Sequence, residues 1–211
     1  MNSPGLSYRS EIDGLRAVAV LPVILFHTGL HWMPGGYVGV DIFFVISGFL
    51  ITGILMRELE AGKFSILKFY ERRARRILPA LFFVMAVTAV LATTFMLPYE
   101  LRDFGRSMIA VIAFISNIFF WDEANYFATA AERLPLLHTW SLSVEEQFYI
   151  LFPIALWFFW NYWRRGLVPA MVVITLSSLV LAEVMVHRSP STAFFLLPTR
   201  GWELLAGSLT S

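Results

Sequence analysis

Long stretches without charged side chains dominate this sequence and limit what it can fold into. Six mainly apolar stretches follow one another within 211 residues. A membrane-crossing helix needs about 20 such residues, because each adds about 1.5 Å across a hydrocarbon core about 30 Å thick. A soluble helical bundle is the alternative, but only 15% of the residues are charged, too few to coat its surface. The sequence therefore predicts an all-α, polytopic integral membrane protein.

The charge-free stretches also predict where the membrane helices lie. The first joins Gly14–Arg16 to Ala17–Val40 and runs into a turn at Pro34-Gly35-Gly36. The others are Tyr37–Met56, Ile77–Tyr99, the short Ser107–Trp121, Gln147–Trp163 and Gly166–Ala182, which extends to about His187. A seventh apolar run begins near Gly201 and reaches only Ser211, too short to cross. We expect about six complete helices and the start of a seventh, in one transmembrane domain over 1–211.

Composition excludes several kinds of site. The chain has no cysteine, which rules out disulfides, thiolate metal ligands and a cysteine nucleophile. Lys and Arg total 16 against 15 Asp and Glu, a balance that gives no support to nucleic-acid binding. The first residues, MNSPGLSYRSEIDG, lack the basic and apolar regions of a signal peptide and read as a polar lead into the first helix.

Basic residues near the ends of the helices predict the orientation. The segment Arg57–Arg76 contains seven Lys and Arg residues, so the positive-inside rule places it, and the N-terminus, in the cytoplasm. Strict alternation of six crossings then puts Arg164 and Arg165 outside, against the rule. Either the short fourth segment does not cross fully, or part of Asp122–Trp140 re-enters the membrane. The path of residues 98–165 stays open at this point.

The first predicted helix carries two ionisable residues, Arg16 and His27. Their separation of eleven residues returns to within about 20° of the same face, about 16 Å along the axis. Charged groups inside a membrane are costly and persist where they line a functional cavity. The alternatives are a structural histidine bonded to its own helix and an arginine that reaches the interface. Together, the pair favours a cavity that is open to the cytoplasm.

The second predicted helix combines glycines with two polar residues. Gly35, Gly36, Gly39, Gly48 and Gly53 allow close approach of a neighbouring helix. Asp41, near the outer end, is a candidate partner for a histidine across such a contact. Ser47 is a weaker candidate, since a helical serine often bonds to its own backbone.

Four arginines in five residues precede the third helix: Arg72, Arg73, Arg75 and Arg76. The positive-inside rule alone accounts for such a basic membrane edge. However, guanidinium groups also bind phosphates bidentately, so the cluster suits a polyanionic ligand.

Two later segments add paired charges. In HTWSLSVEEQFY, Glu145 and Glu146 stand at the head of an apolar stretch. One interpretation is a helix N-terminus with Ser143 as its cap; the other is a carboxylate that points into the bundle to orient a histidine or a substrate hydroxyl. Arg200 and Glu203 lie three residues apart where the last helix begins.

These residues resemble, block by block, the membrane acyltransferase-3 family of bacterial O-acyltransferases. Arg16 and His27 within EIDGLRAVAVLPVILFH match its Arg-x10-His signature, and GGYVGVDIFFVISGFLIT follows. Arg73-Ala74-Arg75-Arg76 fits its Arg-x-Arg-Arg motif; HTWSLSVEEQFYILFP and PTRGWELLAGSL match further blocks in the same order. The resemblance covers about Tyr8 to Leu209, and five ordered blocks make it specific.

The resemblance implies an O-acyltransferase that modifies cell-surface or lipid-linked carbohydrate. Acyl-CoA, with acetyl-CoA expected, would approach from the cytoplasm, its phosphates held by Arg73, Arg75, Arg76 and Arg16. His27 would act as general base or carry the acyl group transiently, helped by Glu145 and Asp41. Further candidates are Ser47, Glu146, Arg200 and Glu203. The expected partners are the bilayer, acyl-CoA and a carbohydrate acceptor, with no bound cofactor and no metal, and the expected location is the bacterial inner membrane.

Members of the family have about ten spans, so we expect this chain to represent the N-terminal part of the family domain. Two other functions stay open. A transporter also needs intramembrane Arg, His, Asp and Glu. An inactive, truncated membrane subunit would keep the motifs without the activity. The sequence leaves the acceptor sugar, the acyl chain length and the oligomeric state undetermined.

Overall fold

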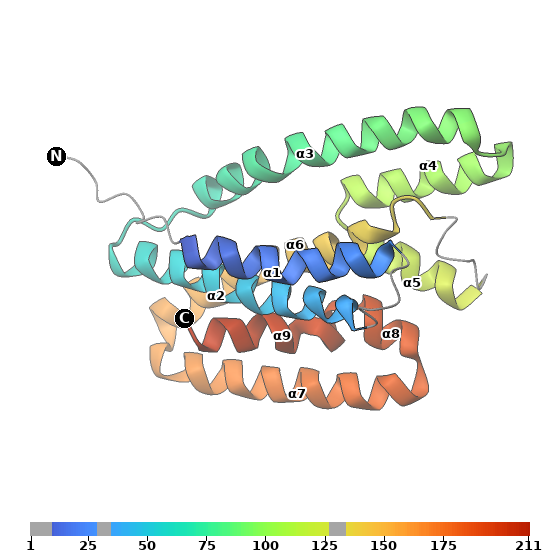
Figure 1. Cartoon of the computed structure of the whole chain (residues 1–211). Helices are drawn as coiled ribbons and strands as arrows, with labels where there is room; N and C mark the ends of the chain where they lie inside the picture. The colour runs from blue at the N-terminus through green and yellow to red at the C-terminus, as the bar shows by residue number, and fades with distance from the viewer. Residues whose placement is uncertain (1–9, 29–34, 127–133) are drawn as a thin grey trace. The chain divides into compact units, whose positions relative to one another are not determined.

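The computed structural model describes residues 10–28, 35–126 and 134–211, and within these ranges the chain forms helices joined by short turns, with no strand. The prediction of an all-α protein is confirmed for this part of the chain. The α-helices are α1 (Ser10–His27), α2 (Gly39–Glu60), α3 (Ile66–Phe95), α4 (Pro98–Ile112), α5 (Ser116–Tyr126), α6 (Trp140–Tyr162), α7 (Leu167–Arg188), α8 (Pro190–Phe195) and α9 (Leu197–Leu209) (Figure 1). Short 3-10 turns precede α2, α6 and α7: η1 (Gly36–Val38), η3 (Leu137–Thr139) and η4 (Arg164–Gly166).

Four helical segments of the described chain are long and apolar enough to cross a membrane: Gly36–Glu60, Ile66–Phe95, Leu137–Tyr162 and Arg164–Arg188. They correspond to the second, third, fifth and sixth predicted spans. The first predicted span is shorter, with an apolar helix over Gly14–His27; its predicted continuation through 29–34, including Pro34, lies outside the described residues. The apolar faces of α3 and α7 are exposed, as lipid contact requires. The chain is thus an integral membrane protein.

The prediction of one helix over Ser107–Trp121 is wrong. The structure breaks this stretch between α4, which ends at Ile112, and α5, which begins at Ser116. Phe114 has a φ of 54°, in the left-handed region that ends a helix, and the Ile115 N–H donates to the carbonyl of Ala110. With 15 and 11 residues, α4 and α5 are each shorter than a membrane-spanning helix.

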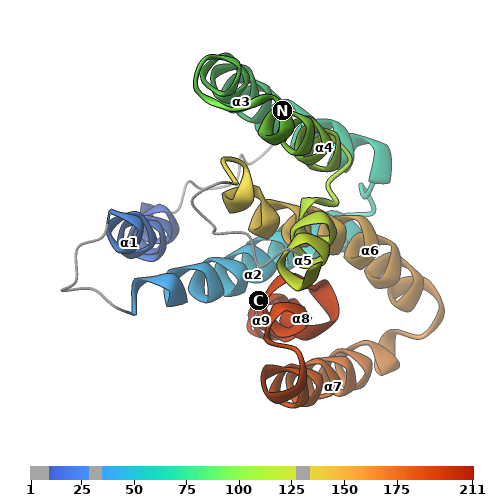
Figure 2. The ribbon, with the colours of Figure 1, turned by 90° about the vertical axis from the view of Figure 1, so that its right-hand side faces the viewer.

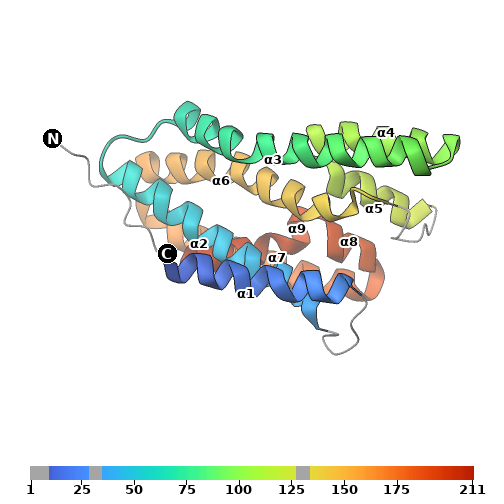
Figure 3. The ribbon, with the colours of Figure 1, turned by 45° about the horizontal axis from the view of Figure 1, so that its top comes forward.

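The chain consists of two compact units: residues 1–53 with 203–211, and residues 54–202. In the second unit, α3 and α4 lie together on one side, α7 lies on the other, and α5, α6 and α8 lie between them (Figure 2). A second view agrees that α3 and α4 lie alongside each other (Figure 3). The prediction of a single domain stays a prediction.

Within the second unit, α3 and α6 run antiparallel. Tyr70 of α3 donates a hydrogen bond of 3.0 Å to the Ile150 carbonyl, and Arg73 pairs with Glu146 at 2.8 Å, so a step forward in α3 is a step backward in α6. The broken fourth segment explains this direction, because α4 turns back from the end of α3 and α5 returns. Arg164 and Arg165 therefore follow α6 at the same end as Ile66, the start of α3. The conflict with the positive-inside rule disappears.

In the first unit, glycines bring helices into backbone contact. A Cβ atom at Gly36 or Gly39 would overlap the carbonyl of Pro22 or Ala19 in α1. A Cβ at Gly48 of α2 would overlap the Leu204 carbonyl of α9, and the same holds for Gly207 and the Val45 carbonyl. The predicted close approach is confirmed at Gly36, Gly39 and Gly48, whereas Gly35 and Gly53 have open space beside them.

Candidate functional site

His27 is the last residue of α1 and is exposed. Its Nδ1 atom lies 2.8 Å from the carbonyl oxygen of Val23, and the ring of Phe26 packs edge-on against the imidazole. A carbonyl oxygen can only accept, so Nδ1 must carry the proton in this hydrogen bond. In the neutral imidazole, Nε2 is then left with its lone pair, as a general base requires. The structural alternative, a histidine bonded to its own helix, is present and also fixes the tautomer.

Arg16 lies on the same helix, as predicted, and is half-buried. Its guanidinium carbon lies 5.2 Å from the ring centroid of Phe43 in α2, which fits a cation–π contact at a partly exposed site. Asp41 lies in the first turn of α2 and is half-exposed, while Ser47 is buried further along the helix. The roles assigned to Arg16, Asp41 and Ser47 stay predictions.

The second unit contains a buried charged network between α3 and α6. Arg73 donates to Glu146 at 2.8 Å, with 17% and 11% of the two side chains exposed. The guanidinium carbon of Arg73 also lies 3.8 Å from the ring centroid of Tyr149. The Tyr149 hydroxyl donates a short hydrogen bond to Glu145. Four side chains on two helices thus form a charge-paired cluster (the α3–α6 network) that is largely shielded from solvent.

The interpretation of the glutamates as an N-terminal charge arrangement with a Ser143 cap is wrong. The helix α6 begins at Trp140 with no acidic residue in its first turn, so Glu145 and Glu146 lie inside it and are buried. The Ser143 hydroxyl lies 2.7 Å from that of Ser116 in α5. The other interpretation, carboxylates that point into the bundle, agrees with this geometry.

The arginine run divides between two directions. Successive residues on a helix differ by about 100°, so four arginines in five positions cannot face one way. Arg73 points into the α3–α6 network, whereas Arg75 and Arg76 are exposed. Arg75 pairs with Glu71 at 2.7 Å on the outer surface of the helix, and Arg72 pairs with Glu58 at 2.6 Å. The structure therefore does not bring Arg73 together with Arg75 as one phosphate site.

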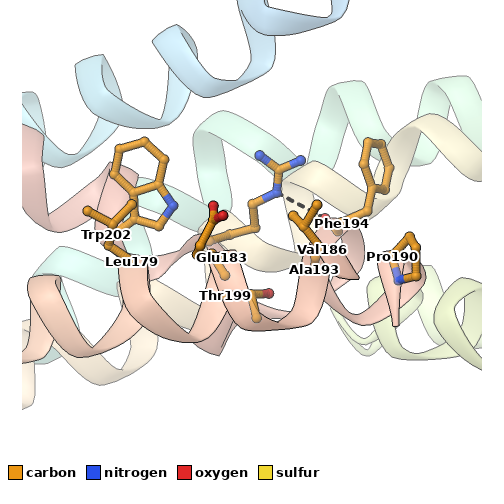
Figure 4. Close-up of a pocket in the computed structure, with 10 residues that line it drawn as sticks. Leu179, Glu183, Val186, Pro190, Ala193, Phe194, Thr199 and Trp202 are labelled. Atoms are coloured by element: carbon orange, nitrogen blue, oxygen red, sulfur yellow. Dashed lines mark hydrogen bonds between the residues drawn. The ribbon is translucent and has the colours of Figure 1, made fainter. Parts of the chain in front are cut away.

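Arg200 borders a groove of about 320 Å³ in the second unit, between α7, α8 and the start of α9. Its Nε donates to the Phe194 carbonyl at 3.1 Å, and its guanidinium lies over the rings of Phe194 and Trp140. Glu183 and Trp202 also line this groove, as Figure 4 shows. Glu203, three residues later, is fully buried in the first unit.

Sequence reasoning missed the polar residues that hold the broken fourth segment against α6. The Ser116 hydroxyl bonds to the hydroxyls of both Thr139 and Ser143, and Gln147 donates to Asn117 at 2.8 Å and to the Phe114 carbonyl at 3.0 Å. The adjacent polar pair Ser116-Asn117 inside an apolar stretch was the available signal. Tyr149 was also missed, since a tyrosine in an apolar helix carries no distinctive pattern.

Across residues 10–28, 35–126 and 134–211, no three or more His, Asp or Glu side chains are grouped to hold a metal ion.

Fold and site together define a helical integral membrane protein with a preformed charged network among its apolar helices. The model of the acyltransferase domain matches residues 9–210, and the chain belongs to this acyltransferase family. The resemblance seen in the sequence motifs is confirmed.

Curated relatives agree with this family. The chain is 37% identical over 207 residues to the O-acetyltransferase OatA of Staphylococcus aureus strain NCTC 8325, which covers 96% of this chain and 34% of that protein. It is also 37% identical over 206 residues to the peptidoglycan O-acetyltransferase OatA of Listeria monocytogenes strain EGD-e, covering 95% and 33%. The chain thus spans about a third of the length of these relatives. No solved structure shows a significant match.

Proposed function

We propose that the protein is a membrane-bound O-acyltransferase that moves an acetyl group from acetyl-CoA to a hydroxyl of a cell-envelope carbohydrate. The observation that carries this proposal is His27, whose Nδ1 bond to Val23 leaves Nε2 as a proton acceptor on an exposed surface. The names of the relatives, which include O-acetyltransferase and peptidoglycan O-acetyltransferase, agree with the acyl group and the acceptor class.

The proposed reaction needs one base and an activated donor. The Nε2 atom of His27 takes the proton of the acceptor hydroxyl, and the oxygen attacks the thioester carbonyl. The C–S bond then breaks, and the leaving thiolate takes a proton from the imidazolium. A thioester is already activated, so this route requires neither a metal nor a nucleophilic cysteine. General base catalysis by a positioned side chain typically contributes about 10²–10⁴-fold in rate.

Two different roles are proposed for the glutamates. Glu146 is already charge-paired with Arg73, whereas Glu145 accepts its hydrogen bond from an uncharged tyrosine. Because Arg73 already engages the Glu146 carboxylate, Glu145 is the better candidate to orient the acceptor hydroxyl. Arg75 and Arg76, which are exposed at the basic end of α3, are proposed to bind the phosphates of the donor.

The basic residues of the second unit support a proposed orientation. Arg75 and Arg76 lie in the first half of α3, and Arg164 and Arg165 follow the end of α6, which runs antiparallel to α3. The positive-inside rule assigns this end to the cytoplasm, where acetyl-CoA is available. We propose the bacterial inner membrane as the location and a cytoplasmic N-terminus.

Labelled acetyl-CoA tests the proposal. Membranes that contain the whole natural polypeptide are expected to transfer label to glycan as an ester that mild alkali releases. His27→Ala should abolish this transfer, while His187→Ala is the matched control, since His187 is also exposed and helical but pairs with Glu183. Label that crosses the membrane without attachment would indicate a transporter instead. Full transfer by His27→Ala would reject the assigned base.

A further inference from the structure

Tyr149 contacts two charged groups at once. Its hydroxyl donates to the Glu145 carboxylate, and its ring lies 3.8 Å from the guanidinium carbon of Arg73. The side chain is only 3% exposed. A tyrosine can serve both contacts because its ring face is negative and its hydroxyl is a donor.

The same tyrosine therefore connects the two adjacent glutamates by different routes. Glu145 is one helical turn before Tyr149 and is bonded to it directly. Glu146 is reached through Arg73, which donates to that carboxylate at 2.8 Å while stacked on the ring. A buried carboxyl group needs hydrogen-bond partners, and the Tyr149 hydroxyl supplies a donor to Glu145.

We propose that Tyr149 is a positioning residue that assigns the two glutamates to separate tasks. Its ring holds Arg73 against Glu146, and its hydroxyl fixes Glu145 as the carboxylate that assists acyl transfer. This inference rests on the proposed function for the role of Glu145. Arg73 of α3 contacts the ring of Tyr149, and Glu145 of α6 accepts the hydrogen bond of its hydroxyl.

Tyr70 provides a matched comparison. Its hydroxyl also joins α3 to α6, with a bond of 3.0 Å, but the acceptor is the Ile150 backbone carbonyl and no carboxylate is involved. A tyrosine that merely ties the helices together should behave like Tyr70, whereas a positioning residue should not.

Tyr149→Phe keeps the ring and removes only the hydroxyl. We expect kcat for acetyl transfer to fall about tenfold at neutral pH, as for the loss of a hydrogen bond to a charged group, while KM for acetyl-CoA stays unchanged. Tyr70→Phe should leave both kcat and KM unchanged. Equal effects of Tyr149→Phe and Tyr70→Phe on kcat, or a rise in KM in place of the fall in kcat, would overturn the proposal.

Infrared spectroscopy makes the test independent of turnover. Bands of Glu145, assigned by difference against Glu145→Gln, should shift in Tyr149→Phe and stay in place in Tyr70→Phe. If Tyr149→Phe does not accumulate, Tyr149→Trp replaces it in the same comparison of Glu145 bands, because tryptophan keeps a ring and lacks the hydroxyl. If the wild type transfers no acetyl group but the Glu145 band shifts in Tyr149→Phe, the positioning of Glu145 by Tyr149 is supported and the proposed function is rejected. If the Glu145 band does not shift in Tyr149→Phe, the positioning role itself is rejected.

Discussion

Arg16 and Arg73 each lie over an aromatic ring, yet their surroundings differ. Arg16 of α1 is half-buried, 5.2 Å from the ring centroid of Phe43. Arg73 of α3 lies 3.8 Å from that of Tyr149, is only 17% exposed and also pairs with Glu146. The first arginine shares its helix with His27, which is exposed, whereas the second belongs to a network assembled from two helices.

The difference suggests that the exposed groups of α1 contact the substrate, whereas the α3–α6 network stabilises the fold. Exposed groups on α1 are available to a substrate and have few contacts to lose, so their substitution should affect chemistry more than folding. The α3–α6 network is buried, and a buried charge left without its partner is strongly destabilising. Substitutions there should affect both. Substitutions in α1 and in the α3–α6 network test whether the two regions differ in this way.

His27→Asn removes the base but keeps a side-chain donor for the Val23 carbonyl. We expect acetyl transfer to fall by about 10²–10⁴-fold, the usual contribution of a general base, with an unchanged unfolding midpoint in detergent. Transfer rate and thermal unfolding are measured on the same preparation. A large loss of stability would mean that α1 is structural in the same sense as the α3–α6 network.

Arg73→Ala should lower the free energy of unfolding by about 3–5 kcal/mol, because Glu146 is left buried without its partner. The control is Arg75→Ala on the same helix. Its partner Glu71 is 58% exposed, so the cost should be about 0–1 kcal/mol. Denaturant titration in detergent measures both variants. Similar values for the two would show that the burial of the Arg73–Glu146 pair is energetically unimportant.

Gly48→Ala should lower stability by about 1–3 kcal/mol, as overpacking usually does, because the new Cβ would overlap the Leu204 carbonyl. Gly53→Ala is the control in the same helix, since nothing lies within 4 Å of its added Cβ. That change should be neutral or stabilising by up to about 1 kcal/mol, as alanine favours the helix. If both glycines tolerate alanine, the contact of α2 with α9 is looser than described.

Phe43→Leu should have the smallest effect, about 0.5–1 kcal/mol, the value of a cation–π contact at an exposed site. A double-mutant cycle with Arg16→Gln isolates the pairwise energy. A coupling well above this range would make the surroundings of Arg16 resemble those of Arg73 and weaken the contrast between the two regions.

Much of the fold could be predicted from the sequence because a membrane helix is identified by a local run of apolar residues. Charge-free runs located the helices α2, α3, α6 and α7, and the first run placed Arg16 and His27 on one helix, α1. The fourth segment was misjudged, since its apolar composition conceals the break at Phe114. The pair Ser116-Asn117 is polar, but a short polar pair in an apolar run does not specify a reversal of direction.

The candidate site was only half predictable. Composition and local spacing were enough to predict a membrane protein with the ordered motifs of an acyltransferase. The packing of α6 against α3 was needed to show that Arg73 turns toward Glu146 while Arg75 stays outside, and that Tyr149 joins the two glutamates. The reason is physical: the partner of Arg73 lies 73 positions away, and which face of α3 is buried depends on how α6 packs against it.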